Sequence, residues 1–274
     1  MKLKQLSLLV AISATALAAA AGQPERIDVE AGAFHPVLSP DGSTLLYSTV
    51  DHHGLKAMNL AQGSVSVIDT EAAAGFNPVF SADGSRVFYR TASLVDGLVY
   101  RDVRSCEPGG SPMRVAEPSR GDVNLQALGA NTYAYADYRD IKVAVNGRET
   151  AVSPLRDAHS YLWASLSPDG SMMSFSEPFM GVYISSPDGT SARKVLDKGD
   201  YVAWAGPSTI IAVVSKDDGY VTTESWLVAV NVNTGITSVL TPADMKVGEA
   251  TASAGGIVVF SDINGNMYKL DLNR

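Results

Sequence analysis

The residues best suited to chemistry in this 274-residue chain are its four histidines, together with the aromatic and charged side chains near them. Imidazole can bind a metal, move a proton or pair with a carboxylate near neutral pH. All four histidines fall in polar segments that separate short apolar runs. The candidate ligand-binding residues in these segments are His35, His52, His53, Tyr138, Arg139, Arg156, His159, Trp163 and Tyr201.

Two short patterns suggest metal binding, and neither is complete. His52 and His53 follow Asp51, but adjacent histidines point apart on an extended chain and no third fixed ligand accompanies them. Residues 262–266 read Asp-Ile-Asn-Gly-Asn, which resembles half of a calcium loop without its distal glutamate. This segment is better interpreted as a hairpin turn. We therefore expect no bound metal and no cofactor.

Motifs for nucleophilic catalysis are equally incomplete. The chain has no Gly-x-Ser-x-Gly nucleophile elbow, and the loop carboxylates Asp122, Asp157 and Glu249 cannot be paired in space from sequence. The only cysteine, Cys106, precedes a glycine-rich run and cannot form an intramolecular disulfide. We interpret it as a loop residue with no special role. The sequence thus predicts no catalytic residue.

An internal repeat must position the candidate residues. Residues 34–48, 76–90 and 162–176 each hold a Ser-Pro-Asp-Gly or Ser-Ala-Asp-Gly turn between two apolar runs. Asp41 and Asp83 are 42 residues apart, and Asp83 and Asp169 are 86 apart, which is two steps of 43. Weaker copies fall at residues 125–136, 202–215 and 254–261. A period of this length made of short strands is typical of propeller blades.

Each repeat is expected to form four antiparallel strands, but the last one lacks a segment for its outermost strand. Residues 25–29 supply a spare strand, which we expect to complete the last blade and close the ring. Six units of about 42 residues need about 252, close to the length of residues 22–274. The predicted fold is all-β: a six-bladed β-propeller of four-stranded antiparallel blades over residues 22–274, with the N-terminal strand closing the last blade.

Residues 1–21 are interpreted as a signal peptide. Lys2 and Lys4 precede an alanine-rich apolar run that ends in several Ala-x-Ala cleavage points. A membrane anchor is the alternative, but the run of about 16 residues is shorter than a span requires. We expect a periplasmic or secreted protein without a membrane span. It is not a lipoprotein, because Cys106 lies far from the cleavage points.

The charge of the chain restricts its partners. The sequence holds 29 acidic and 21 basic residues, a net charge of −8. Removing Lys2 and Lys4 with the leader leaves 19 basic residues and a net charge of −10. This excess disfavours nucleic acid and anionic membranes, which attract basic surfaces. We expect a protein or peptide partner, a basic one by charge, and a monomeric chain.

The repeat, with its Ser-Pro-Asp-Gly turn, apolar strand, polar loop and Ile-Tyr-like third strand, resembles the TolB-type, WD-like propeller repeat. That resemblance covers the propeller alone, without the α/β domain that precedes it in the family. It implies a periplasmic or secreted scaffold that recruits protein partners.

The expected function is non-catalytic binding of a protein or peptide on the loop face around the central channel. The alternative is a funnel-type enzyme or glycan-binding protein, such as a propeller lyase or glycosidase. Two facing carboxylates in a deep funnel would favour the enzyme, whereas an apolar rim would favour protein binding. Trp163 occupies the position of His35 and Asn77 in their repeats, so it is a candidate channel residue, with packing in the core as the alternative. Trp204 is expected in the core.

Overall fold

The Ser-x-Asp-x-Ser turn of the repeat is the local device that joins the first two strands of a blade. The Asp41 carboxylate accepts hydrogen bonds from the Ser39 hydroxyl at 2.6 Å and from the Ser43 backbone N–H at 3.0 Å. The same arrangement recurs at Asp83 and at Asp169. Gly42 follows with φ of 73°, a left-handed conformation that glycine adopts at little cost. These turns need no functional explanation.

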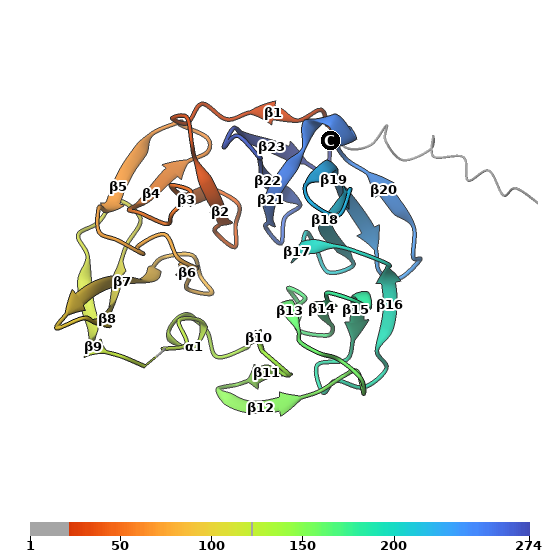
Figure 1. Cartoon of the computed structure of the whole chain (residues 1–274), viewed down its shortest axis with the longest axis horizontal. Helices are drawn as coiled ribbons and strands as arrows, with labels where there is room; N and C mark the ends of the chain where they lie inside the picture. Colours follow the sequence, from red (N-terminus) through yellow and green to blue (C-terminus); the bar gives the residue numbers. More distant parts are fainter. Residues whose placement is uncertain (1–21, 122) are drawn as a thin grey trace, which may run out of the picture.

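The structure, a computed structural model, describes residues 22–121 and 123–274, which form six antiparallel sheets arranged in a ring (Figure 1). The predicted leader, residues 1–21, lies outside the described residues. The strands of each sheet follow one another from the channel outward, with the first strand innermost. Blade 1 contains β2 (Phe34–Leu38), β3 (Thr44–Ser48), β4 (Leu55–Asn59) and β5 (Val65–Asp69). Blade 2 contains β6 (Val79–Phe80), β7 (Val87–Val95), β8 (Leu98–Cys106) and β9 (Met113–Ser119).

The remaining blades follow in chain order around the ring. Blade 3 contains β10 (Tyr133–Asp137), β11 (Asp140–Val145) and β12 (Arg148–Val152). Blade 4 contains β13 (Leu162–Leu166), β14 (Met173–Glu177), β15 (Gly181–Ser185) and β16 (Arg193–Leu196). Blade 5 contains β17 (Asp200–Trp204), β18 (Thr209–Asp217), β19 (Thr222–Asn231) and β20 (Thr237–Val239), followed by the short helix η1 (Ala243–Met245).

Blade 6 is built from both ends of the described chain, as predicted. It contains β21 (Val247–Ala252), β22 (Ile257–Asp262), β23 (Met267–Asp271) and, as its outer strand, β1 (Glu25–Arg26). Glu25 lies opposite Lys269, and Ile27, which follows β1, donates its backbone N–H to the Met267 carbonyl at 2.9 Å. The expected six-bladed all-β propeller and its closure by the N-terminal strand are confirmed.

Blade 3 differs from the expected four strands, because a one-turn helix α1 (Gln126–Gly129) stands where the first strand was predicted. The reason is that contacts with blade 2 hold this segment. Leu125 packs against Phe88 and Val103 of blade 2, and the Gly129 carbonyl accepts the Ala82 N–H at 2.9 Å. A side chain at Gly129 would lie 2.9 Å from the Phe80 carbonyl oxygen, so this approach needs glycine. The segment is fastened to blade 2 and leaves β10 as the innermost strand of its sheet.

Apolar layers between neighbouring blades form the core. Trp204 is buried between blades 4 and 5, as expected, and donates its indole N–H to the Ser165 carbonyl at 3.2 Å. The layer between blades 2 and 3 has the smallest apolar cluster among the described residues, formed by Phe88, Val103 and Leu125 with Val79 and Val123 packed against them.

The placement predicted for Cys106 was wrong. It ends β8, and it is buried in the layer between blades 1 and 2. Burial raises the pKa of its thiol to about 11, so the thiol stays protonated and inert at neutral pH. Within residues 22–121 and 123–274, none of the helices has the length and apolar character to cross a bilayer.

Ring closure can be tested at Ile27, which is buried against Tyr47, Val259 and Met267. We expect Ile27→Ala to lower the free energy of unfolding by about 2 kcal/mol, because it leaves a cavity at the joint that closes the ring. The measurement is urea denaturation followed by fluorescence. Ile236→Ala is the matched control, because Ile236 is 52% exposed and its truncation should cost less than about 0.5 kcal/mol. Equal losses in the two variants would contradict the role of this joint.

Candidate functional site

The site begins with a backbone irregularity that recurs at the start of the inner strands. His35, Asn77, Trp163 and Tyr201 all have φ between 47° and 57°, in the left-handed region. That region costs a non-glycine residue about 1–2 kcal/mol. Strain of this kind persists only where the surrounding structure imposes it, and it is concentrated at functional sites.

His35, Trp163 and Tyr201 each belong to a bulge, and Asn77 lies two residues before β6. The strand register shifts by one extra residue between Phe34 and Val37, between Leu162 and Ser165, and between Asp200 and Ala203. Blade 6 has a similar shift at Gly248, between Val247 and Glu249. A bulge turns a side chain out of the regular alternation of a strand. Here it directs the bulged side chains into the channel.

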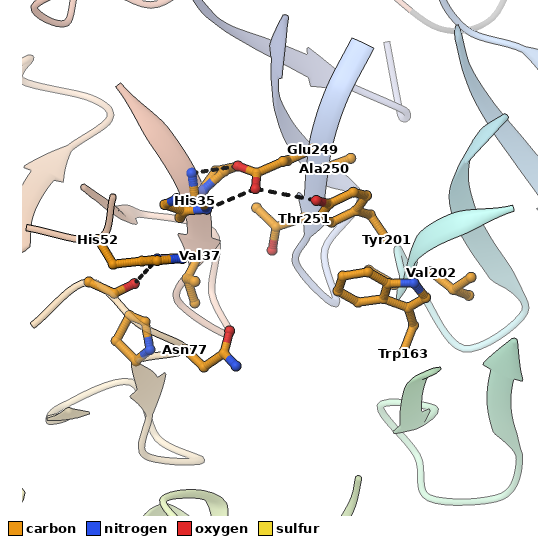
Figure 2. Close-up of a pocket in the computed structure, with 14 residues that line it drawn as sticks. His35, Val37, His52, Asn77, Trp163, Tyr201, Val202, Glu249, Ala250 and Thr251 are labelled. Atoms are coloured by element: carbon orange, nitrogen blue, oxygen red, sulfur yellow. Dashed lines mark hydrogen bonds and ion pairs between the residues drawn. The ribbon is translucent and has the colours of Figure 1, made fainter. Parts of the chain in front are cut away.

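These side chains line a cavity of about 410 Å³ at the end of the channel where the inner strands begin. Figure 2 shows His35 and His52 on one side of it, Trp163 and Tyr201 on the other, and Glu249 between the two pairs. The other lining residues are Pro36, Val37, Gly75, Asn77, Pro78, Val202, Ala203, Ala250 and Thr251. The lining comes from blades 1, 2, 4, 5 and 6, so the cavity exists only in the closed ring.

An ion pair between blades 1 and 6 is the polar centre of the cavity. His35 Nδ1 donates to Glu249 Oε1 at 2.8 Å, and the His35 backbone N–H donates to Oε2 at 2.6 Å. His35 Nε2 lies 3.1 Å from the Val50 carbonyl oxygen. Both neighbours of the ring are acceptors, so both nitrogens carry protons and His35 is an imidazolium.

The pKa values of this pair follow from the contact. Burial alone would lower the pKa of His35, but the hydrogen bond and the charge of Glu249 outweigh it and raise the pKa above 6.5. Burial would likewise raise the pKa of Glu249, yet the hydrogen bonds and charge of His35 lower it below 4.5. Each group therefore holds the other in its charged form.

His52 lies against this pair in a different protonation state. Its ring stacks on His35 with centroids 3.7 Å apart and an interplanar angle of 21°. Burial, and then the positive charge of His35, lower the pKa of His52 below 6.5. Its Nδ1 lies 3.3 Å from the Gly75 carbonyl oxygen and carries the single proton. Nε2 of His52 is left as an acceptor.

The opposite wall of the cavity is aromatic. The rings of Trp163 and Tyr201 have centroids 4.3 Å apart at an angle of 32°. The Tyr201 hydroxyl donates to Glu249 Oε1 at 3.4 Å, so this wall adjoins the carboxylate. Burial, and then the charge of Glu249, raise the pKa of Tyr201 to about 12.

Four of the nine predicted residues come together in this cavity: His35, His52, Trp163 and Tyr201. The other five lie outside its lining, on exposed connections at the same end of the blades. They are His53, Tyr138, Arg139, Arg156 and His159. His159 contacts Phe179 edge to face, with centroids 5.7 Å apart, and its backbone N–H donates to Glu177 at 3.1 Å.

The carboxylate at the centre of the cavity, Glu249, was missing from the predicted site residues, although it was recognised as a loop acid. Its repeat copy has Gly248 at the bulge, so the glutamate does not align with His35 or Trp163. Asp157 does not line the cavity, and Asp122 lies outside the described residues. Within the ranges that the structure describes, no group of three or more His, Cys, Asp and Glu side chains is arranged to hold a metal ion.

No protein-family model matches the chain, and no curated protein matches it in sequence. Solved structures resemble it in fold. The putative TolB from Agrobacterium tumefaciens has a TM-score of 0.55 and 17% identity, covering 86% of this chain and 88% of that one. A structural genomics protein of unknown function from Bacteroides thetaiotaomicron has a TM-score of 0.58 and 12% identity, covering 93% and 73%.

A third neighbour is the β-propeller domain of Cps50 (Swd1) from Myceliophteria thermophila, with a TM-score of 0.53, 10% identity and coverage of 92% and 98%. At these identities the likeness establishes the fold alone. The resemblance to TolB-like propellers is thus confirmed as a resemblance of architecture.

The His35–Glu249 pair predicts a pH dependence of stability. A histidine pKa raised by folding adds stability below its unfolded value of 6.5, which is lost as the pH rises through the folded pKa. A glutamate pKa lowered by folding adds stability above 4.5, which is lost as the pH falls through the folded pKa. A double-mutant cycle of His35→Gln and Glu249→Gln should give a coupling of about 1–2 kcal/mol near pH 5.5, and much less near pH 9.

The exposed pair Lys216–Glu224 is the control for this cycle, because its coupling should stay below about 1 kcal/mol at both pH values. Urea denaturation of each variant measures the couplings. A His35–Glu249 coupling that does not change with pH would contradict the assigned charges.

The left-handed backbone at Asn77 gives a second prediction. Asn77→Gly should keep or raise the free energy of unfolding, because glycine adopts a φ of 47° without strain. Asn77→Val should lower it by about 1–2 kcal/mol, because a β-branched side chain is strongly disfavoured there. Thermal unfolding measures both variants. If the valine variant were as stable as the glycine variant, the backbone would not be left-handed at this position.

Proposed function

We propose that this chain is an exported, non-catalytic binding protein that receives a peptide segment or protein loop of a partner on the face where the cavity opens. The observation that carries this proposal is a set of exposed apolar side chains around the cavity. Recognition uses this rim together with the central cavity.

The apolar rim consists of one residue from the connection between the second and third strands of each blade, or from the strand end beside it. Its members are Val50, Val95, Tyr138, Phe179, Tyr220 and Ile263. Phe179 is 82% exposed and Tyr220 is 96% exposed. Single exposed apolar residues are ordinary, but their recurrence at equivalent positions around one opening is typical of an interaction surface.

Two long hairpins enlarge this surface. Strands β7 and β8 of blade 2, and β18 and β19 of blade 5, are each nine or ten residues long, against four to six in most of the other described strands. Blades 2 and 5 lie opposite each other in the ring (Figure 1). The first hairpin carries the exposed residues Leu94, Val95, Leu98 and Val99, and the second carries Tyr220 and Val221. A partner that spans the channel would contact both hairpins.

The chemistry of the cavity supports binding over hydrolysis. Glycosidases use two carboxylates that flank the bond to be cleaved. Among the described residues that line the cavity, Glu249 is the one carboxylate, and His35 and Tyr201 already occupy its oxygens. A glutamate whose pKa is lowered is also a poor general acid.

Export and charge complete the proposal. Residues 1–21 have the composition of a secretory leader, so we assign the protein to the periplasm or the extracellular space. We also propose that it is a monomer. The excess of acidic residues would speed association with a basic partner and would weaken that association at high salt.

The test is selection of peptides from a displayed random library on the purified chain, followed by calorimetry of the selected peptides. We expect Phe179→Ser/Tyr220→Ser to weaken binding by about tenfold or more, because exposed aromatic residues are frequent hot spots. Val145→Ser/Ile236→Ser is the matched control, since both residues are about half exposed but lie on the opposite face. Equal binding by the two double variants would contradict the proposal.

A further inference from the structure

We infer that the central cavity receives the guanidinium group of an arginine side chain, between the Trp163 ring and the Glu249 carboxylate, with release of one proton from His35. This inference rests on the proposed function and names the chemical group that the partner inserts.

The size of the cavity limits what can enter it. About 410 Å³ is near the lower end of the range for small-molecule sites, so it accommodates one long side chain rather than a folded element. The rim residues lie at the same end of the blades as the cavity, because the second strand of a blade ends where its inner strand begins. A partner seated on the rim can therefore place one side chain into the cavity.

The aromatic wall favours a flat cation. Trp163 is 37% exposed, and the Tyr201 ring contacts it at a tilt of 32°, which restricts the orientation of the indole. Cations bind the faces of aromatic rings, tryptophan most strongly. Guanidinium is planar and weakly hydrated, so it stacks on such a ring better than an ammonium group does.

The carboxylate lies next to this wall. Glu249 lines the cavity with 15% of its side chain exposed, and the Tyr201 hydroxyl donates to its Oε1 at 3.4 Å. A guanidinium that stacks on the indole can therefore direct its edge N–H groups toward Glu249. Carboxylate and guanidinium together form charge-assisted hydrogen bonds of matching geometry.

Binding of this cation displaces a proton from His35. Without a ligand, the imidazolium of His35 balances Glu249, and its Nε2–H donates to the Val50 carbonyl. An arriving guanidinium takes the place of the Nδ1–H at Oε1 and puts a second positive charge beside the ring. His35 then loses its Nδ1 proton to solvent and remains neutral, with its Nε2–H still on Val50.

The other titratable groups around His35 do not supply the released proton in its place. His52, from the connection between β3 and β4, stacks on His35 and is neutral, since burial and His35 itself lower its pKa. Tyr201 on β17 reaches the pair only through Glu249, and its pKa is raised to about 12. Asp51 acts on His52 from the exposed side and favours its charged form weakly.

An anionic ligand fits the cavity less well. It would meet the Glu249 carboxylate, and the imidazolium beside it is already paired. The chain as a whole is also acidic, with 29 acidic against 21 basic residues, which favours the approach of cations over anions.

The experiment is calorimetric titration of the chain with Nα-acetyl-L-arginine amide and with its uncharged isostere, Nα-acetyl-L-citrulline amide. We expect the arginine probe to bind at least about tenfold more tightly than the citrulline probe. Its affinity should rise by up to about tenfold per pH unit while His35 titrates. Titrations in buffers of different ionisation enthalpy should show release of close to one proton at the acidic end of this range, falling toward zero above it.

Variants separate the parts of the site. Glu249→Gln should abolish the preference for arginine, and Trp163→Ala should weaken binding about fivefold or more, while Trp163→Phe retains part of it. His35→Gln should bind the arginine probe without pH dependence. Circular dichroism confirms that each variant is folded.

Equal affinity for the two probes, absence of binding up to about 20 mM, or binding without proton release would overturn the inference. These results are distinct from failure of the proposed function. If the arginine probe fails but peptides still bind through Phe179 and Tyr220, only the guanidinium site is wrong. If the arginine probe binds while the rim variants leave peptide binding unchanged, the rim is wrong and the cavity assignment stands.

Discussion

Closure of the ring is the constraint on which the rest of the molecule depends. A blade has two apolar faces, and both are buried only when it has a neighbour on each side. The pairing of β1 with β23 completes the last blade, and Ile27 extends this joint into the layer between blades 6 and 1. The small apolar cluster between blades 2 and 3 is tolerable because closure elsewhere holds these two blades together.

The cavity also depends on closure of the ring. His35 belongs to blade 1 and Glu249 to blade 6, so the central ion pair crosses the same junction that the N-terminal strand completes. The pair brings two charges together at the channel, and each is stabilised by the other more than by water. Loss of closure would therefore separate the imidazolium from its carboxylate and remove one wall of the cavity.

The fold was predictable from the sequence because the Ser-x-Asp-x-Ser turns recur at a nearly constant spacing and need no tertiary contact to form. Blade 3 was not fully predictable, because Leu125 and Gly129 follow blade 2 through long-range packing rather than local propensity. The buried position of Cys106 was not predictable either, because β8 continues past its apolar residues as far as Cys106. Alignment of the repeats gave Trp163 the same channel position as His35. It did not do so for Glu249, because the blade of Glu249 carries the bulge on glycine.

At the left-handed positions of the inner strands, most of the side chains that face the cavity are not the ones that pack between blades. His35, Asn77 and Trp163 belong to none of the apolar layers between blades, although each lies on or beside an inner strand, whereas Tyr201 also packs against the layer between blades 5 and 6. Their side chains face the channel because of the backbone, whatever their chemical type. A ring of such blades therefore carries several channel positions that the packing between blades constrains little. It can acquire a new ligand by substitutions there that tolerate a left-handed backbone, while its architecture stays unchanged.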